Sequence, residues 1–191
     1  MRPECVGRLR TRGLALFSLI MARLPNFSAV FAALALAACA SGPRYEGQVY
    51  RGDGIAFRTG PVPASWSRVT ATGTRLAFRD EAARATMLVN GRCGRDADDV
   101  PLAALTEHLF LRFTERTVDD EKLLPFDGRE ALRTVMTAKL DGVPRKFEAV
   151  VMKKDGCVYD LILITAPDDF TAAQAAFEPF VTGFHAGDDV K

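Results

Sequence analysis

Two Asp-Gly pairs in the second half of the chain constrain its fold more than any other feature. Asp141-Gly142 and Asp155-Gly156 separate three strand-like runs of residues. Asp-Gly is typical of the two-residue type I′ turns that join antiparallel strands. Turns of this length predict four cross-strand pairs: Leu140 with Val143, Met136 with Phe147, Lys154 with Cys157, and Ala149 with Ile162. The sequence therefore predicts a three-stranded antiparallel meander.

Both faces of this predicted meander are apolar near its centre. One face collects Leu132, Met136, Ala138, Phe147, Ala149, Val151, Ile162 and Ile164, and the other collects Val150, Met152, Tyr159, Leu161 and Leu163. A sheet that is apolar on both faces needs a covering layer on each side. The sequence therefore predicts helices above and below the sheet.

Two amphipathic patterns can supply those helices, one at 101–116 and the other at 168–184. The first carries Leu102, Leu105, Leu109 and Phe113 on one stripe, and the second carries Phe170, Ala173, Phe177, Phe180 and Phe184. Each starts with proline or acidic residues, which favour the first turn of a helix. A phenylalanine stripe could also form a partner groove or a lipid-facing surface, but its spacing is what any helix covering a sheet shows.

The first half of the chain has the pattern of strands too. Strand-like runs cover 48–51, 55–58, 74–78 and 84–90, with turn residues at 52–54 and 90–91. The order of strands, helix, strands and helix predicts an α+β fold. We expect a mostly antiparallel sheet of about six or seven strands covered by two main helices.

A separate signal lies near the N-terminus, where an apolar run from Phe27 to Ala38 is followed directly by Cys39. The run has twelve residues, whereas a membrane-spanning helix needs about 20, so its length suits a secretory signal peptide. Leu36-Ala37-Ala38-Cys39 resembles the lipobox of bacterial lipoproteins. That resemblance implies that Cys39 is acylated and becomes the first mature residue. An uncleaved anchor over 13–38 is the alternative, but Arg23, Pro25 and Asn26 interrupt it.

The lipobox interpretation divides the chain into four parts. Residues 1–38 form a signal peptide whose true start is Met21, 39–46 form the lipidated cysteine and a short tether, 47–186 form one α+β domain, and 187–191 form a tail. Removal of 1–38 leaves 153 residues with 20 Lys and Arg against 23 Asp and Glu, a net charge of −3. These interspersed charges do not suggest nucleic-acid binding.

Cysteine usage agrees with export. Cys93 and Cys157 remain after Cys5 is removed with the signal peptide and Cys39 is assigned to lipid. Two cysteines in an oxidising compartment predict a disulfide, and two separate thiols are the alternative. Without a CxxC motif or an adjacent histidine, they do not indicate a metal or redox site.

The succession of elements resembles the PsbP-like α/β/α sandwich. The residues that carry this resemblance are the strand Gly54–Arg58, the turn Pro61–Trp66, the mid-chain helix, the long meander, and a last helix that ends at Gly183-Phe184. Cystatin-like and nuclear-transport-factor-like sheets are alternatives. The family implies a binding or assembly-assisting role with no common catalytic motif, so no site residue and no cofactor carries over.

Candidate catalytic and metal-binding residues are sparse. The three mature serines lie in no nucleophile motif. His108 lacks the H-E-x-x-H spacing of a metal site, and His185 follows the last predicted helix, near a frayed terminus. The cluster Asp96, Asp98 and Asp99 lacks the spacing of a calcium loop and favours a helix cap and a solvated loop. Asp119-Asp120-Glu121 has the pattern of a polar connection, and Trp66 that of a turn residue folded onto the core edge. We expect no catalytic residue, no cofactor and no metal.

These patterns predict a non-enzymatic envelope lipoprotein, held to the membrane by lipid on Cys39, whose domain binds an envelope protein. A carrier of a small apolar ligand or lipid is the alternative, with its cavity between the phenylalanine-bearing helix and the sheet. We expect the domain to face the periplasm. Ala40, in place of aspartate after the cysteine, favours the outer membrane over the inner one.

Overall fold

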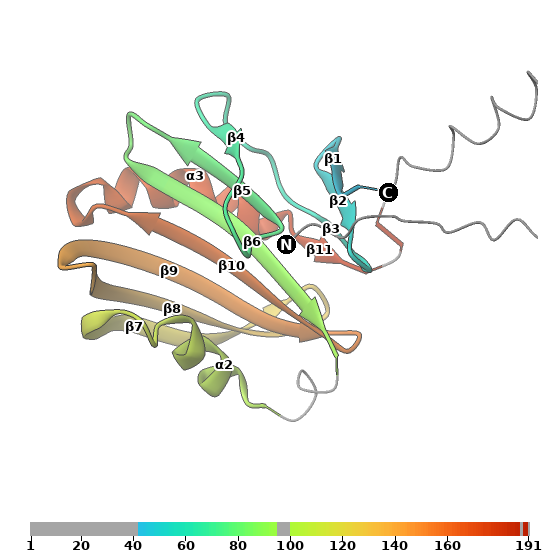
Figure 1. The fold of residues 1–191 in the computed structure, drawn as a ribbon. Coiled ribbons are helices and arrows are strands. Elements are labelled where there is room, and N and C mark those ends of the chain that lie inside the picture. Colours follow the sequence, from blue (N-terminus) through green and yellow to red (C-terminus); the bar gives the residue numbers. More distant parts are fainter. Residues whose placement is uncertain (1–41, 95–99, 188, 191) are drawn as a thin grey trace, which may run out of the picture. The chain divides into compact units, whose positions relative to one another are not determined.

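The computed structural model describes residues 42–94, 100–187 and 189–190, and these form two antiparallel sheets and two α-helices (Figure 1). The larger sheet has seven strands in the order β4-β5-β6-β10-β9-β8-β7. Its strands are β4 (Ser67–Val69), β5 (Leu76–Asp80), β6 (Ala85–Cys93), β7 (Thr114–Phe126), β8 (Arg129–Leu140), β9 (Val143–Lys154) and β10 (Cys157–Thr165). The smaller sheet has the order β1-β2-β3-β11, with β1 (Arg44–Glu46), β2 (Val49–Gly52), β3 (Ile55–Arg58) and β11 (His185–Ala186). The α+β fold class is confirmed.

The meander has the register that the Asp-Gly turns predict. The four expected pairs, Leu140 with Val143, Met136 with Phe147, Lys154 with Cys157 and Ala149 with Ile162, all face one another. Asp141 and Asp155 have positive φ, as do the glycines that follow them, which type I′ turns require. A third pair, Asp127-Gly128, joins β7 to β8 in the same way.

A helix covers each face of the large sheet. α3 (Phe170–Thr182), preceded by the 3-10 turn η2 (Pro167–Asp169), packs its phenylalanine stripe on one face. Phe177 and Phe180 are completely buried, so this stripe is core, as predicted. α2 (Leu102–Leu109) covers part of the opposite face, where Leu105 packs on Val151 and Val158.

The first helix is shorter than predicted. α2 ends at Leu109, and the chain leaves it through two tight turns, Phe110 N–H to the carbonyl of Glu107 and Phe113 N–H to that of Phe110. Both phenylalanine rings then pack against Phe147, with ring centroids 5.5 and 4.8 Å away. Contact with the sheet therefore ends the helical stripe before Phe113.

Two local predictions were wrong. The pair Asn90-Gly91 is not a turn but part of β6, because both residues pair with β10, and a side chain at Gly91 would crowd Ile55 and Tyr159. Asp119-Asp120-Glu121 is not a connection but the middle of β7. β7 is an edge strand exposed along most of its length, so it lacks the apolar alternation by which strands are recognised.

The ends of the folded unit also differ from the expected boundaries. β1 lies at Arg44–Glu46, inside the expected tether, because it pairs with β2 and places Tyr45 against Phe78. In the expected C-terminal tail, Val190 is buried, and its carbonyl accepts a hydrogen bond from Arg51. The folded unit therefore extends beyond 47–186 on both sides.

Candidate functional site

Cys93 and Cys157 form a disulfide between the ends of β6 and β10. The two residues lie directly opposite each other in the strand register, with Cα atoms 4.0 Å apart and 64 positions apart in sequence. The predicted pairing is therefore confirmed, and it makes these cysteines structural. Cys39 lies outside the described residues.

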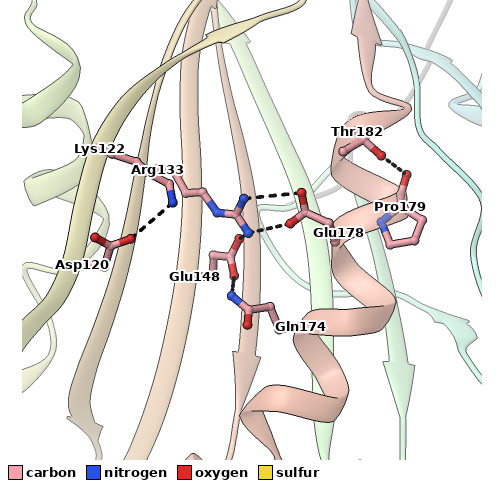
Figure 2. Close-up of polar contacts among 8 residues, drawn as sticks. All are labelled: Asp120, Lys122, Arg133, Glu148, Gln174, Glu178, Pro179 and Thr182. Carbon is pink, nitrogen blue, oxygen red and sulfur yellow. Dashed lines mark hydrogen bonds and ion pairs between the residues drawn. The ribbon is translucent and has the colours of Figure 1, made fainter.

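A cluster of charged side chains lies between α3 and the large sheet (Figure 2). Arg133 of β8 lies between two carboxylates: its Nη2 is 2.6 Å from Glu148 Oε1 of β9 and 2.6 Å from Glu178 Oε2 of α3. Gln174 of α3 donates a hydrogen bond from Nε2 to Glu148 Oε2 at 2.7 Å. The four side chains thus join two strands to two successive turns of the helix.

Burial sets the electrostatics of this cluster. Glu148 is completely buried, and its pKa is raised by burial although Gln174 and Arg133 oppose that shift. Burial acts to lower the pKa of Arg133, but its contacts with Glu178 and Glu148 outweigh this and raise it. The two carboxylates keep Arg133 positively charged, and these ion pairs and hydrogen bonds link α3 to the large sheet. The cavity beside it, lined by Phe126, Arg133, Glu178 and Phe184 among others, measures about 260 Å³.

A second buried carboxylate, Asp160 of β10, points to the opposite side of the sheet. It is completely buried, and Arg92 of β6 donates to its Oδ2 at 2.8 Å. Among the described residues, its Oδ1 has no hydrogen-bond partner, and burial raises its pKa. A buried carboxylate oxygen without a donor is costly, so a donor from a bound molecule would stabilise Asp160.

Asp160 lines a cavity beside α2. This cavity measures about 570 Å³ and mixes apolar and polar walls. Its lining includes Leu88, Asn90, Leu109, Arg112, Phe113 and Ile162. Its volume falls in the range of small-molecule sites, about 300 to 1,000 Å³. The cavity against the phenylalanine-bearing helix, where a carrier site is expected, measures about 260 Å³, less than half the volume of the one beside α2.

Several exposed apolar side chains lie on the side of the sheet that carries α2, spread from the β8–β9 turn to the far half of β7. The large apolar side chains that are most exposed within the described ranges are Leu111 (62%), Leu123 (55%), Val118 (52%) and Val143 (47%). Val118 and Leu123 face Met136 and Leu132 across the β7–β8 pair, and a register shift after Val118 keeps both on one face. We call Leu111, Val118, Leu123 and Val143 the α2-side patch.

The remaining candidate residues do not come together. His108 is exposed on α2, and Trp66 is buried at the core, as predicted. His185 is not at a frayed end: it lies in β11, where its Nδ1 contacts Asp127 Oδ1 and its Nε2 is 3.4 Å from Asp189. The cluster Asp96, Asp98 and Asp99 lies outside the described residues. None of the described residues form a group of three or more potential metal ligands.

Across 42–94, 100–187 and 189–190, the helices are too short or too polar to cross a bilayer. No family model matches the chain, and no curated protein resembles it in sequence at a significant level.

Solved structures do resemble the fold. LpqN of Mycobacterium tuberculosis, described as involved in cell envelope biogenesis, is 15% identical over 75% of this chain and 88% of its own, with a TM-score of 0.52. CyanoP, the cyanobacterial PsbP of Synechocystis, is 17% identical over 76% of this chain and 91% of its own, with a TM-score of 0.54. At these identities the likeness shows the fold alone. The domain therefore has the PsbP-like arrangement of an antiparallel sheet between helices.

Proposed function

We propose that this chain is a lipid-anchored protein of the bacterial cell envelope whose domain binds another envelope protein without catalysis. The anchor rests on the lipobox-like residues Leu36 to Cys39. The fold shared with LpqN, which is involved in cell envelope biogenesis, supports the location. Ala40 favours the outer membrane over the inner one.

The α2-side patch is the observation that carries the binding role. A single exposed apolar residue is ordinary on a protein surface, whereas four on one side of the same sheet favour an interaction site on that side. Val118 and Leu123 lie on the edge strand β7, where no further strand of the described fold covers them. The partner that suits them is a protein with a matching apolar surface.

The buried carboxylates support a binding role over catalysis. Glu148 is held by Arg133 and Gln174, and Asp160 by Arg92. A general acid or base must reach the substrate within hydrogen-bond distance, whereas Glu148 lies sealed beneath α3. Glu148 therefore suits a structural role, whereas Asp160 lines the cavity beside α2.

Acylation is tested at Cys39. We expect the full-length protein to incorporate labelled fatty acid and to fractionate with membranes, and the Cys39→Ala variant to lose the label. Cys5→Ala is the matched control, because the proposal assigns Cys5 to the discarded segment. Labelling that persists in Cys39→Ala contradicts the anchor.

Partner binding is tested on the patch. In cells that lack the protein, we expect the wild-type chain to restore the envelope phenotype and to crosslink to one envelope protein, and the Val118→Lys/Leu123→Lys variant to do neither. Ala64→Lys, an exposed position in the turn after β3, is the control. Equal complementation by the patch variant contradicts this role.

A second candidate function, binding of a small amphipathic molecule, is favoured by the cavity of about 570 Å³ at Asp160. Native mass spectrometry of the protein purified from its own cells tests it. A co-purifying mass that is absent from the Ile162→Trp variant supports a ligand, and a clean apo mass contradicts it.

A further inference from the structure

The cavity of about 570 Å³ has a floor that is apolar at one end and polar at the other. It lies beside Leu109, the last residue of α2. The β6–β10 register pairs Leu88 with Ile162 and Asn90 with Asp160. Because side chains alternate along a strand, these four all lie on the α2 side of the sheet. Leu88 and Ile162 are only partly buried, although their strands are central in the sheet.

The polar end of the floor holds a carboxylate oxygen without a donor. Arg92 donates to Asp160 Oδ2 at 2.8 Å, whereas Oδ1 has no hydrogen-bond partner within the described ranges. The side chain is completely buried. A buried acceptor without a donor is costly. A bound molecule that donates a hydrogen bond to Oδ1 would remove this cost.

The charges around the cavity narrow the polar end of such a molecule. Asp141 and Arg112 are the other charged residues of the lining; both are exposed and opposite in sign. A carboxylate end has no proton to donate to Asp160, and two like charges repel each other. A hydroxyl or an ammonium group can donate, and donation to an ionised carboxylate is stronger than a hydrogen bond between neutral groups.

The apolar part of the lining suits a hydrocarbon chain. It consists of partly buried side chains from three strands, the end of α2 and the turn after it: Leu88, Leu109, Phe113, Leu140 and Ile162. A chain lying against them would remove their remaining apolar surface from water, which is favourable.

We propose that this cavity binds an amphipathic molecule whose polar end is a hydroxyl or ammonium group that donates a hydrogen bond to Asp160 Oδ1. The hydrocarbon part of the molecule packs on Leu88 and Ile162. This inference rests on the second candidate function above and adds the chemical class of the ligand and the residue that selects it.

Three probes with the same eight-carbon chain and different polar ends test the inference: 1-octanol, octylamine and octanoate. The full-length protein is held in phosphatidylcholine vesicles, and equilibrium dialysis measures the bound probe against protein-free vesicles. We expect octanol and octylamine to bind at least about tenfold more tightly than octanoate, because a site built to pair a buried polar group rejects an analogue that leaves it unpaired. Either order of octanol and octylamine supports the inference, and the order shows whether the ligand is neutral or cationic.

Asp160→Asn should reverse this preference. If Arg92 still donates to the side-chain oxygen, the amide NH₂ takes the place of Oδ1 and donates into the cavity. Octanoate should then bind at least as tightly as octylamine. The control is Asp155→Asn, which removes the same charge at an exposed turn position outside the lining and should keep the wild-type preference. Asparagine tolerates the positive φ of that position.

The comparison of probes on the wild-type protein does not depend on the folding of any variant. Octanoate that binds wild type as tightly as the other two probes overturns the selection by Asp160 and leaves a ligand-binding function in place. Absence of saturable binding by all three also overturns the inference. The second candidate function fails with it only if native mass spectrometry shows a clean apo mass as well.

Discussion

Glu148 is completely buried beneath α3, and the guanidinium of Arg133 lies 2.6 Å from its Oε1. Removing a carboxylate from water is costly, and an ion pair offsets that cost only when its geometry is good and the other polar atoms are also satisfied. Gln174 satisfies the second oxygen, and Glu178 takes the remaining side of the arginine. The stability of the α3 contact therefore depends on Arg133 more than on any other member of the cluster.

Replacement of Arg133 by methionine should be strongly destabilising. The variant leaves the buried carboxylate of Glu148 without its cation, and loss of one partner of a buried pair costs about 3 to 5 kcal/mol. Glu178→Gln is the control, since Glu178 is half exposed and its loss leaves Arg133 paired with Glu148, at a cost of about 1 kcal/mol or less. Urea unfolding of the three proteins measures the difference. Similar losses of unfolding free energy in Arg133→Met and Glu178→Gln would contradict the larger role assigned to Arg133.

Asp160 should give the protein a distinctive pH dependence. Burial raises its pKa above the ordinary 3.8, so between the two values the folded protein binds more protons than the unfolded chain. This group therefore lowers the free energy of unfolding as pH rises from about 4. Asp160→Asn removes that dependence. We therefore expect the free energy of unfolding of the variant, taken relative to wild type, to increase as pH rises from about 4 to 7.

Urea titrations at several pH values measure this relative stability. The exposed Glu130→Gln variant serves as the control and should follow wild type across the range. A relative stability of Asp160→Asn that falls as pH rises would contradict a raised pKa for the Asp160 carboxyl.

The disulfide should contribute substantially to stability. It closes a loop with a sequence separation of 64, for which the chain-entropy model gives about 4 kcal/mol. The Cys93→Ser/Cys157→Ser variant should therefore unfold at lower urea than wild type, and reduction of wild type should bring its midpoint down to that of the variant. If reduction leaves the wild-type midpoint unchanged, the bond is not formed in the folded protein.

The meander and its register could be predicted from the sequence because Asp-Gly turns and a two-residue period act locally. Asp141-Gly142 fixes which residue follows the turn, and every later pair follows from alternation. Strand β7 could not be recognised in this way, since both sides of an edge strand can be polar. The Asp127-Gly128 pair that follows β7 is the sequence feature that could have indicated a strand there.

The charged cluster beneath α3 depends on contacts between distant segments. Glu148 is a lone acid within the apolar run from Phe147 to Met152, which indicates a buried carboxylate but not its partner. Arg133 is 15 positions away, and Glu178 belongs to a separate helix. The β8–β9 register already places Arg133 on the same face as Glu148, diagonally across from it, whereas only the packing of α3 on the sheet brings in Gln174 and Glu178. The helical half of the cluster therefore could not be predicted from the sequence.

Gly60 is a close contact point between α3 and the segment after β3. Its N–H donates to the carbonyl of Phe180 at 2.9 Å, and a Cβ placed on Gly60 would lie 1.9 Å from the carbonyl oxygen of Pro179. Because backbone atoms cannot move aside as a flexible side chain can, Gly60→Ala should separate the two segments. We expect a loss of about 3 kcal/mol, the upper end for overpacking.

The matched control is Gly42→Ala, where an added Cβ has no atom of the described residues within 4 Å. It should leave the urea midpoint within experimental error of wild type. Hydrogen exchange locates the damage: in Gly60→Ala, the amides at the end of α3 and in β11 should exchange faster, while those of β8 and β9 keep their protection. The small sheet joins the core partly through this contact, so a Gly60→Ala protein with wild-type exchange in β11 would show that the small sheet is held by its aromatic packing alone.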